Sequence, residues 1–308
     1  AYYHDLEKFD FSETRYINSL IDYGEYIDKK RRYQRSEIDP NNKLSIYGDV
    51  RNNGVFYFDD DTIHKIEYII KDFGGNVSRL PIVVLASPFT DPAGFPPPDN
   101  ASYFSISEKN TFQAPNINIE LSGDCLYRDL WFTYDTAGAP NRAYSRIHKI
   151  HNEQTPVHKY YKLSLVPDSI SPDTDKLLLA RVDDKGDYIY SGGKWKDGAL
   201  QASVRSFGDY TILIDTVPPT IQSVNISSGI IKSDRLTVKV KVKDDLSGVS
   251  KYRATLNGEW LLMEYDPKNS LLIYFIDERL KKGSNDFRVE VIDGRGNEAV
   301  FVKKLVRK

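Results

Sequence analysis

The chain has 308 residues, and its 42 Lys and Arg nearly balance its 44 Asp and Glu, giving a formal net charge of −2. The basic residues are spread along the chain, which excludes the concentrated positive surface of a nucleic-acid-binding protein. Cys125 is the single cysteine, so no internal disulfide can form. No apolar run is long enough to span a membrane, and no signal peptide is recognised. The 21 Tyr and 14 Phe favour half-buried strands.

The N-terminal part contains the single basic run, Lys29-Lys30-Arg31-Arg32-Tyr33-Gln34-Arg35. Lys30, Arg31 and Arg32, with Arg15 upstream, are candidates for contact with an anionic glycan or a partner protein. The alternative is a solvated loop, because acidic residues beside the run offset its charge. The surrounding segment from Phe11 to Tyr33 has neither strand alternation nor a strong helical stripe.

A hairpin follows, in which Ile63 to Lys71 and Val77 to Leu85 flank the turn Asp72-Phe73-Gly74-Gly75-Asn76. In such a turn the Asp side chain accepts hydrogen bonds from the backbone N–H groups after it, and Gly75 takes a positive φ without steric cost. Val55 to Phe58 predicts a further strand.

A Pro-rich stretch, residues 88–100, marks a first domain boundary. The middle part then alternates in several strands, but its long loops leave the topology of this β-sandwich open. Trp131 lies in a strand pattern and is expected in the core. Trp195 lies between glycines at a predicted hairpin tip, where it either stacks on a sugar ring or folds inward onto the sandwich.

Three histidines in the middle part, His148, His151 and His158, are weak metal candidates. On a helix, the first two would share a face and could ligate zinc. The stretch from Arg142 to Lys159 reads as a loop, however, so spacing is the sole argument for a site here.

The second boundary is Asp215-Thr216-Val217-Pro218-Pro219, a short and stiff joint. Beyond it, Leu236, Val238, Val240 and Val242 alternate with polar residues, which predicts one buried and one wet strand face. Trp260 is expected in the core, and a short helix is expected near Asp277 to Lys281. The Asp-x-x-Gly-Asn turn recurs at Asp293-Gly294-Arg295-Gly296-Asn297.

Several acidic runs could in principle suggest calcium, but none has the ligand spacing of an EF-hand loop. They are interpreted as hairpin turns, since Asp and Gly favour turns in any case. The runs are 59–61, 183–187 and 244–245.

Together these patterns predict an all-β protein of tandem β-sandwich domains. The expected domains are 1–87, immunoglobulin-like; 88–215, a middle β-sandwich; and 216–308, a C-terminal immunoglobulin-like domain. Complete catalytic motifs are missing from the sequence, so no catalytic or cofactor-binding residue is assigned.

Scattered blocks of the sequence resemble one family. The most specific is Phe11-Ser12-Glu13-Thr14-Arg15-Tyr16-Ile17-Asn18-Ser19-Leu20-Ile21-Asp22-Tyr23, followed by blocks at 30–32, 42–47, 64–66, 72–76, 126–130, 203–208, 264–266 and 293–297. They are similar to the region after the catalytic domain in lysostaphin-like (LytM-type) zinc endopeptidases of Bacteroidetes. The five histidines do not reproduce the family's His-x(3)-Asp and His-x-His ligand motifs, so no catalytic residue can be transferred.

The resemblance implies a non-catalytic accessory region of a peptidoglycan endopeptidase, at the periplasm or cell surface. Zinc would belong to an upstream catalytic domain or a separate chain, which this region would position or restrict. Peptidoglycan is a further expected partner. The alternative from a different class is an envelope module that binds glycan or protein through Trp195.

The first domain is expected to lack strands. Ala1 to Asp10 allow one strand, and about four in all leave an apolar face uncovered, including some of Ile66, Tyr68, Ile70, Val83 and Leu85. Burial of that face would contribute about 25 cal/mol per Å². We therefore expect upstream residues or a separate chain to supply the missing strands.

Overall fold

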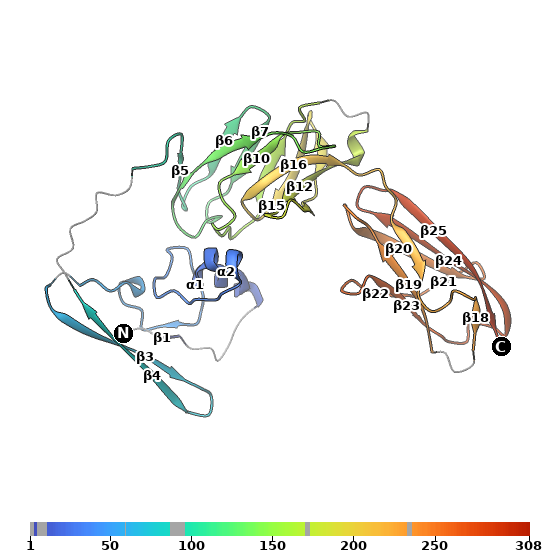
Figure 1. Cartoon of the computed structure of the whole chain (residues 1–308), viewed down its shortest axis with the longest axis horizontal. Helices are drawn as coiled ribbons and strands as arrows, with labels where there is room; N and C mark the ends of the chain where they lie inside the picture. Colours follow the sequence, from blue (N-terminus) through green and yellow to red (C-terminus); the bar gives the residue numbers. More distant parts are fainter. Residues whose placement is uncertain (1–2, 5–10, 59, 87–95, 170–172, 233–235) are drawn as a thin grey trace. The chain divides into compact units, whose positions relative to one another are not determined.

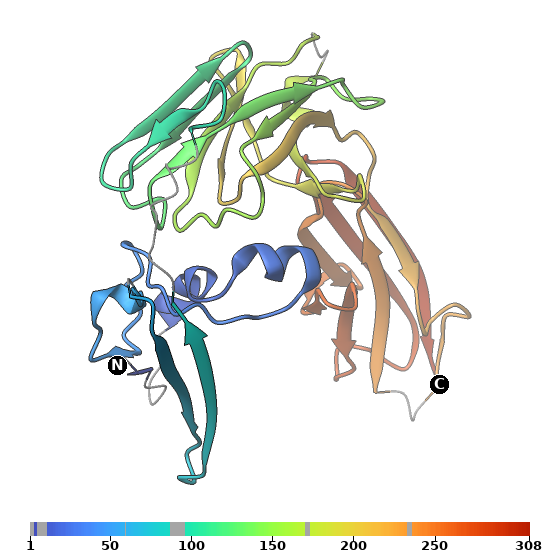
Figure 2. The same ribbon diagram turned by 60° about the vertical axis from the view of Figure 1, so that its left-hand side comes forward.

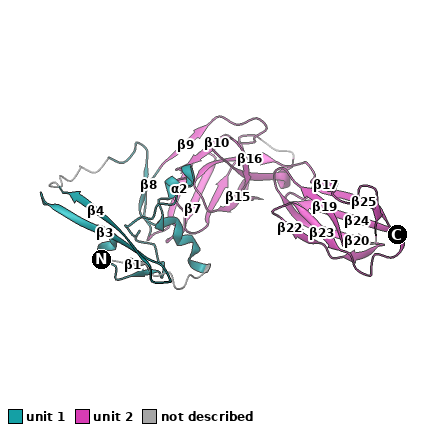
Figure 3. Cartoon of the chain, turned by 60° about the horizontal axis from the view of Figure 1, so that its bottom comes forward, with its two compact units in different colours: residues 1–106, 126–132 teal, residues 107–125, 133–308 magenta. Residues whose placement is uncertain are grey.

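The computed structural model describes residues 3–4, 11–58, 60–86, 96–169, 173–232 and 236–308. Two compact units are formed, one by residues 1–106 and 126–132, the other by 107–125 and 133–308 (Figure 3). Strands dominate throughout (Figure 1), so the predicted all-β class with tandem β-sandwiches is confirmed. No helix of the described residues is both long and apolar enough to cross a membrane.

Short helices occupy the N-terminal segment of ambiguous periodicity, from Phe11 to Tyr33, and one more follows it. They are η1 (Phe11–Tyr16), α1 (Ile17–Leu20), α2 (Tyr23–Lys29) and η2 (Asn52–Gly54). The Asp22 side chain caps α2 by accepting a 3.0 Å hydrogen bond from Glu25 N, and Lys30 ends the helix with a φ of 57°. The strand predicted at Val55–Phe58 is wrong, because these residues form no regular element.

The strands of unit 1 form three antiparallel pairs. These are β1 (Tyr3–His4) with β2 (Tyr47–Gly48), β3 (Ile63–Lys71) with β4 (Val77–Leu85), and β5 (Ser102–Phe104) with β8 (Leu130–Phe132). The described part of residues 1–87 thus holds two separate strand pairs. Closure of this region into an immunoglobulin-like domain stays a prediction that depends on additional strands.

A buried carboxylate ties unit 1 together. Asp39 accepts hydrogen bonds from Ser19 Oγ at 2.5 Å, Arg35 Nη1 at 3.1 Å and Arg128 Nε at 2.7 Å. Asn41 Nδ2 donates to the carbonyl of Leu126 at 2.7 Å. The strand that bears Leu130 and Trp131 is therefore anchored to the helical segment although it is distant in sequence.

Two five-stranded sheets form the middle sandwich of unit 2, in the orders β13-β12-β16-β10-β9 and β14-β15-β11-β7-β6. The elements are β6 (Asn110–Ala114), β7 (Ile117–Leu121), β9 (Tyr134–Ala137), β10 (Ile147–Ile150), β11 (Tyr161–Leu165), η3 (Thr174–Lys176), β12 (Leu177–Val182), β13 (Tyr188–Tyr190), β14 (Lys194–Lys196), β15 (Ala199–Val204) and β16 (Gly208–Ile214). Ile119, Leu163 and Ile212 are fully buried between the sheets. The prediction of a loop from Arg142 to Lys159 is wrong, because β10 lies within this stretch and pairs with β9 and β16.

The C-terminal sandwich packs a four-stranded sheet, β17-β19-β23-β22, on a five-stranded one, β18-β25-β24-β20-β21. Its strands are β17 (Thr220–Ser223), β18 (Ile230–Ile231), β19 (Thr237–Lys243), β20 (Val249–Leu256), β21 (Glu259–Leu261), β22 (Glu264–Asp266), β23 (Leu271–Phe275), β24 (Gly283–Asp293) and β25 (Glu298–Arg307). Val238, Val240 and Val242 are buried as the alternation predicts, but Leu236, expected on the same face, precedes β19 and is 78% exposed. The helix expected at Asp277–Lys281 is wrong: the Asp277 carboxylate accepts hydrogen bonds from Arg279 N and Tyr274 OH in a turn.

Both Asp-x-x-Gly-Asn turns have the predicted geometry. Gly75 has a φ of 84° and Gly296 a φ of 76°. Asp72 and Asp293 each accept a hydrogen bond from the backbone N–H of the Asn four residues later, at 2.8 and 2.9 Å. The turn mechanism inferred from the sequence is therefore confirmed at both positions.

Candidate functional site

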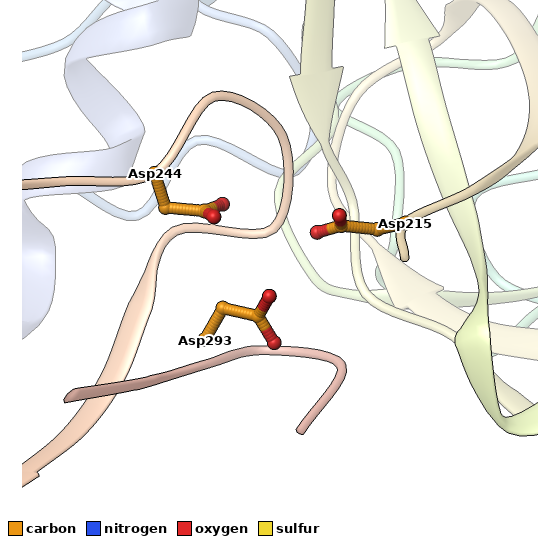
Figure 4. A group of neighbouring side chains, drawn as sticks. All are labelled: Asp215, Asp244 and Asp293. Atoms are coloured by element: carbon orange, nitrogen blue, oxygen red, sulfur yellow. The ribbon is translucent and has the colours of Figure 1, made fainter. Parts of the chain in front are cut away.

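Three carboxylates converge beside the joint between the two sandwiches of unit 2 (Figure 4). One oxygen of each of Asp215, Asp244 and Asp293 lies within 4.8 Å of the others. Among the residues that the structure describes, no other group of three His, Cys, Asp or Glu side chains meets this criterion. The joint supplies Asp215, the loop after β19 supplies Asp244, and the end of β24 supplies Asp293.

Backbone donors hold each of these carboxylates in place. Asp215 accepts from Val217 N and Ser247 N, both at 3.2 Å, and Asp244 accepts from Leu246 N and Gly248 N. Burial raises the pKa of Asp244, and the negative charges of Asp215 and Asp293 raise it further. Carboxylate oxygens are ligands that calcium prefers, but calcium takes six or more oxygens, and this cluster provides three carboxylate groups.

Arg295, in the turn after β24, contacts the middle sandwich. Its Nη1 donates to the carbonyls of Leu177 and Gly193 at 2.7 and 2.9 Å, and its Nη2 donates to Tyr190 OH at 2.7 Å. Lys176 Nζ in turn donates to the Arg295 carbonyl at 2.8 Å. This turn therefore shapes a hairpin and also links the two sandwiches of unit 2.

The three candidate histidines do not form a metal site. His148 is buried in β10, where its Nδ1 lies 2.8 Å from Tyr134 OH, while His151 Nδ1 lies 3.3 Å from Thr133 Oγ1. Burial lowers the pKa of His148 and of His151 to about 4. The backbone N–H of His158 donates to the Cys125 carbonyl, and the His158 carbonyl accepts from Arg205 Nε. The group of three possible metal ligands found among the described residues does not include these histidines, so the structure gives the weak metal assignment no support.

The tryptophans are distributed differently from the expectation. Trp195 lies half-buried in β14 opposite Leu200, which agrees with inward folding rather than with a sugar platform at a hairpin tip. Trp131 and Trp260, both expected in the core, are 44% and 57% exposed. Alternation shows which residues of a strand share a face. The inward face is then chosen as the more apolar one, and this choice fails where a large apolar residue lies on the outer face.

The basic run lies at the C-terminal end of α2. Lys30, Arg31 and Arg32 are exposed, and Lys30 and Arg32 lie over the Tyr26 ring at 5.5 and 5.6 Å from its centroid. The Arg15 carbonyl accepts a hydrogen bond from Tyr127 OH. Lys30, Arg31 and Arg32 therefore fit both a solvated surface and a contact with a partner, whereas Arg15 is half-buried.

The β3–β4 ribbon has two chemically different faces. The register pairs Ile66 with Ile82 and Tyr68 with Leu80, and these residues define an apolar face that also contains His64, Ile70, Ser78 and Val84. The opposite face, called the charged face, carries Lys65, Glu67, Lys71 and Arg79 together with Ile63, Ile69, Val77, Pro81, Val83 and Leu85. Val83 and Leu85, expected among the apolar-face residues, therefore lie on the charged face.

The apolar face is uncovered toward the hairpin turn. Figure 2 shows the two strands extending away from the helices of unit 1. Tyr68, Leu80 and Ile82 are exposed, and Ile70 is 69% exposed. On the charged face, Arg79 Nη1 donates to Glu67 Oε2 at 2.7 Å. The charged face also exposes apolar side chains, among them Val83 at 65% and Leu85 at 74%, so the two faces differ in their ionic residues rather than in exposure.

A Zu5-like domain model matches residues 101–215, which is less than half of the chain. No curated protein matches the sequence. Among solved structures, the chain is similar to an apo expansin from Clavibacter michiganensis, with 13% identity, a TM-score of 0.23, and coverage of 43% of this chain and 74% of that one. It is also similar to PcdhgB3 EC1-4, with 12% identity, a TM-score of 0.22, and coverage of 80% and 64%. These likenesses carry no argument about function.

Proposed function

We propose that this chain is a non-catalytic accessory region of a cell-envelope peptidoglycan endopeptidase, acting at the periplasm or cell surface. Its β3–β4 ribbon would dock the polypeptide that carries the zinc-dependent catalytic domain. The observation that carries this proposal is the uncovered apolar face around Tyr68, Ile70 and Leu80. The resemblance of the Phe11–Tyr23 block to the region after such catalytic domains supplies the identity of the partner.

An isolated two-stranded ribbon is marginally stable in water, and its outer edges expose unpaired backbone groups. A second sheet about 10 Å away would cover the apolar face, and added strands would pair with the edges. Near the turn, the charged face differs because Ile69 lies among ionic side chains, including the Glu67–Arg79 ion pair, which are compatible with solvent. The occupant that fits is an alternating β-segment that brings one apolar face of its own.

Docking is tested with the chain and a lysostaphin-like zinc domain, including its flanking strands, as separate polypeptides. Isothermal titration calorimetry measures their association. Ile70→Lys places a charge on the apolar face and should abolish binding. Ile69→Lys, one residue away on the charged face, is the matched control and should bind like the unmodified chain. Equal binding by both variants, or no association of the unmodified chain, would contradict docking through this face.

The non-catalytic part of the proposal has a separate test. The purified chain should release no soluble peptide fragments from peptidoglycan, with or without added zinc. Addition of the zinc domain should restore turnover. Zinc-dependent hydrolysis by the chain alone would overturn the assignment as an accessory region.

The second candidate function is an envelope module that binds glycan or protein. Trp195, the residue that the sequence suggested for binding, is half-buried and therefore a poor ligand platform. The exposed Trp131 favours a binding surface elsewhere. A peptidoglycan pull-down compares the chain with Trp195→Ala and with Trp131→Ala. If the chain binds peptidoglycan and Trp195→Ala does not, the binding site lies at Trp195 as the sequence suggested.

A further inference from the structure

The β5–β8 pair presents two aromatic side chains on a rigid support. Tyr103 lies directly opposite Trp131 in the antiparallel register. On the reverse face of the same pair, Phe104 and Phe132 stack with ring centroids 4.4 Å apart and an interplanar angle of 2°. Both Phe rings are almost completely buried. The outer pair therefore rests on a packed aromatic layer that fixes the backbone beneath it.

The outer rings remain accessible. Tyr103 is 56% exposed and Trp131 is 44% exposed, with centroids 5.2 Å apart and an interplanar angle of 61°. This angle makes a corner rather than a flat plate, so a ligand can lie on the face of one ring and against the edge of the other. Large aromatic rings that stay exposed on a rigid strand pair are typical of recognition surfaces.

The Asp129 carboxylate lies beside the two rings and adds a hydrogen-bond acceptor to the site. Asp129 Oδ2 accepts a 2.6 Å hydrogen bond from Tyr103 OH, and Asp129 Oδ1 accepts one from Ile106 N at 2.8 Å. The hydrogen bond from Tyr103, followed by the one from Ile106, lowers the pKa of Asp129. The Ser105 side chain hydrogen-bonds to Asp129 as well, but the carboxylate is exposed and has about four acceptor positions, so it can accept a further hydrogen bond from a ligand.

These features select the chemistry of the ligand. The negative charge of Asp129 disfavours an anion, and the neighbouring Arg128 is already paired with Asp39 and Glu37. A proline-rich peptide stacks on aromatic rings but has few N–H groups to donate to the carboxylate. A pyranose with equatorial hydroxyls presents C–H groups on both ring faces and O–H donors around its edge, which satisfies the aromatic corner and the carboxylate together.

We propose that Tyr103, Trp131 and Asp129 form a binding site for neutral, β-linked oligosaccharides of gluco-configured pyranoses. A sugar ring stacks on Trp131, the Tyr103 ring lines its side, and a hydroxyl at its edge donates to Asp129. This site rests on the second candidate function, the glycan-binding module, and names its ligand class. It lies outside the β3–β4 ribbon and does not depend on the docking function, so either can fail without the other.

The test titrates the full chain with cellotetraose and tetra-N-acetylchitotetraose, both neutral, following binding by calorimetry. Trp131→Ala should weaken binding at least tenfold, whereas Trp131→Phe keeps an aromatic face and should retain most of it. Trp260→Ala removes an exposed Trp from β21 in the C-terminal sandwich and should leave affinity unchanged. Asp129→Asn keeps one acceptor oxygen and should weaken binding by a few-fold.

Ligand controls separate stacking from non-specific adhesion. A β-1,4-galactotetraose, in which the C4 oxygen of each ring is axial rather than equatorial, should bind several-fold more weakly than cellotetraose. The proposal is overturned if neither gluco-configured tetrasaccharide binds at millimolar concentration. It is equally overturned if Trp131→Ala binds as well as the unmodified chain with an unchanged far-ultraviolet spectrum, or if a decaproline peptide binds at Trp131 while the sugars do not.

Discussion

Ile69 and Ile70 are neighbours in β3, but the pleat places Ile69 on the charged face and Ile70 on the apolar face of the β3–β4 ribbon. Both side chains are well exposed, at 55% and 69%. Exposure alone therefore does not distinguish them, and the difference lies in their neighbours. Ile69 pairs with Arg79, whereas Ile70 continues a row of apolar residues.

This relationship predicts that lysine substitutions at the two positions differ in their effect on hydrophobic-dye binding and self-association. Ile70→Lys should reduce the binding of a hydrophobic dye and the light scattering of concentrated solutions, because it interrupts the exposed apolar patch. Ile69→Lys should change both signals much less. Neither substitution should alter thermal stability by more than about 0.5 kcal/mol, since both side chains are exposed. Identical dye binding by the two variants would show that the faces are equivalent.

Gly296→Ala should destabilise the C-terminal sandwich by about 1 kcal/mol or more, because alanine is strained at a φ of 76°. Space is not the reason, since the nearest atom to an added Cβ is Lys176 Nζ at 3.9 Å. Gly138→Ala is the matched control, because that site has open space and no left-handed φ. Chemical denaturation measures both variants, and an equally small effect would mean that the turn tolerates alanine.

Arg295→Ala should uncouple the two sandwiches of unit 2. The substitution removes three donated hydrogen bonds and leaves the buried Leu177 carbonyl without the Arg295 donor. We expect a loss of about 2 kcal/mol of stability. Calorimetry should resolve a broader unfolding transition, as the sandwiches begin to melt separately. Arg288→Ala, which removes an ion pair within β24, serves as the control and should leave the transition sharp.

The same variant tests the stiffness of the joint at residues 215–219. Small-angle scattering of the unmodified chain should fit a narrow range of angles between these two sandwiches. The reasons are that the joint contains two prolines and that Asp215 forms hydrogen bonds with the C-terminal sandwich. Arg295→Ala should broaden that range. A broad range in the unmodified chain would contradict the stiff joint.

Stability should fall as the pH drops from about 6.5 toward 4, through His148 and His151. Burial lowers the pKa of each from its ordinary value of 6.5 to about 4. The unfolded chain therefore binds protons in this window while the folded chain does not, so the contribution present above pH 6.5 is lost on acidification. Each group contributes a slope of up to about 1.4 kcal/mol per pH unit. His148→Gln should flatten the slope, measured by urea denaturation at several pH values; an unchanged slope would exclude His148.

The sequence by itself determined the local features. The alternation around Val238 follows from the two-residue period of a strand, and the two Asp-x-x-Gly-Asn turns follow from the positive φ that Gly adopts. The joint follows from the proline residues, which lack an N–H group, and all three effects act over a few residues. For the same reason the sequence predicted the β3–β4 hairpin. It placed Val83 on the wrong face, because register fixes the faces and only strand pairing fixes register.

The tertiary structure decided which distant residues meet. Asp215, Asp244 and Asp293 belong to a joint and two turns that each look ordinary in sequence, and the fold alone brings their oxygens together. Trp131 reads as core because apolar residues in strands usually face inward, and only the packing of Phe104 against Phe132 reveals which side is inside. Burial and long-range contact are properties of the folded chain, and no local pattern encodes them completely.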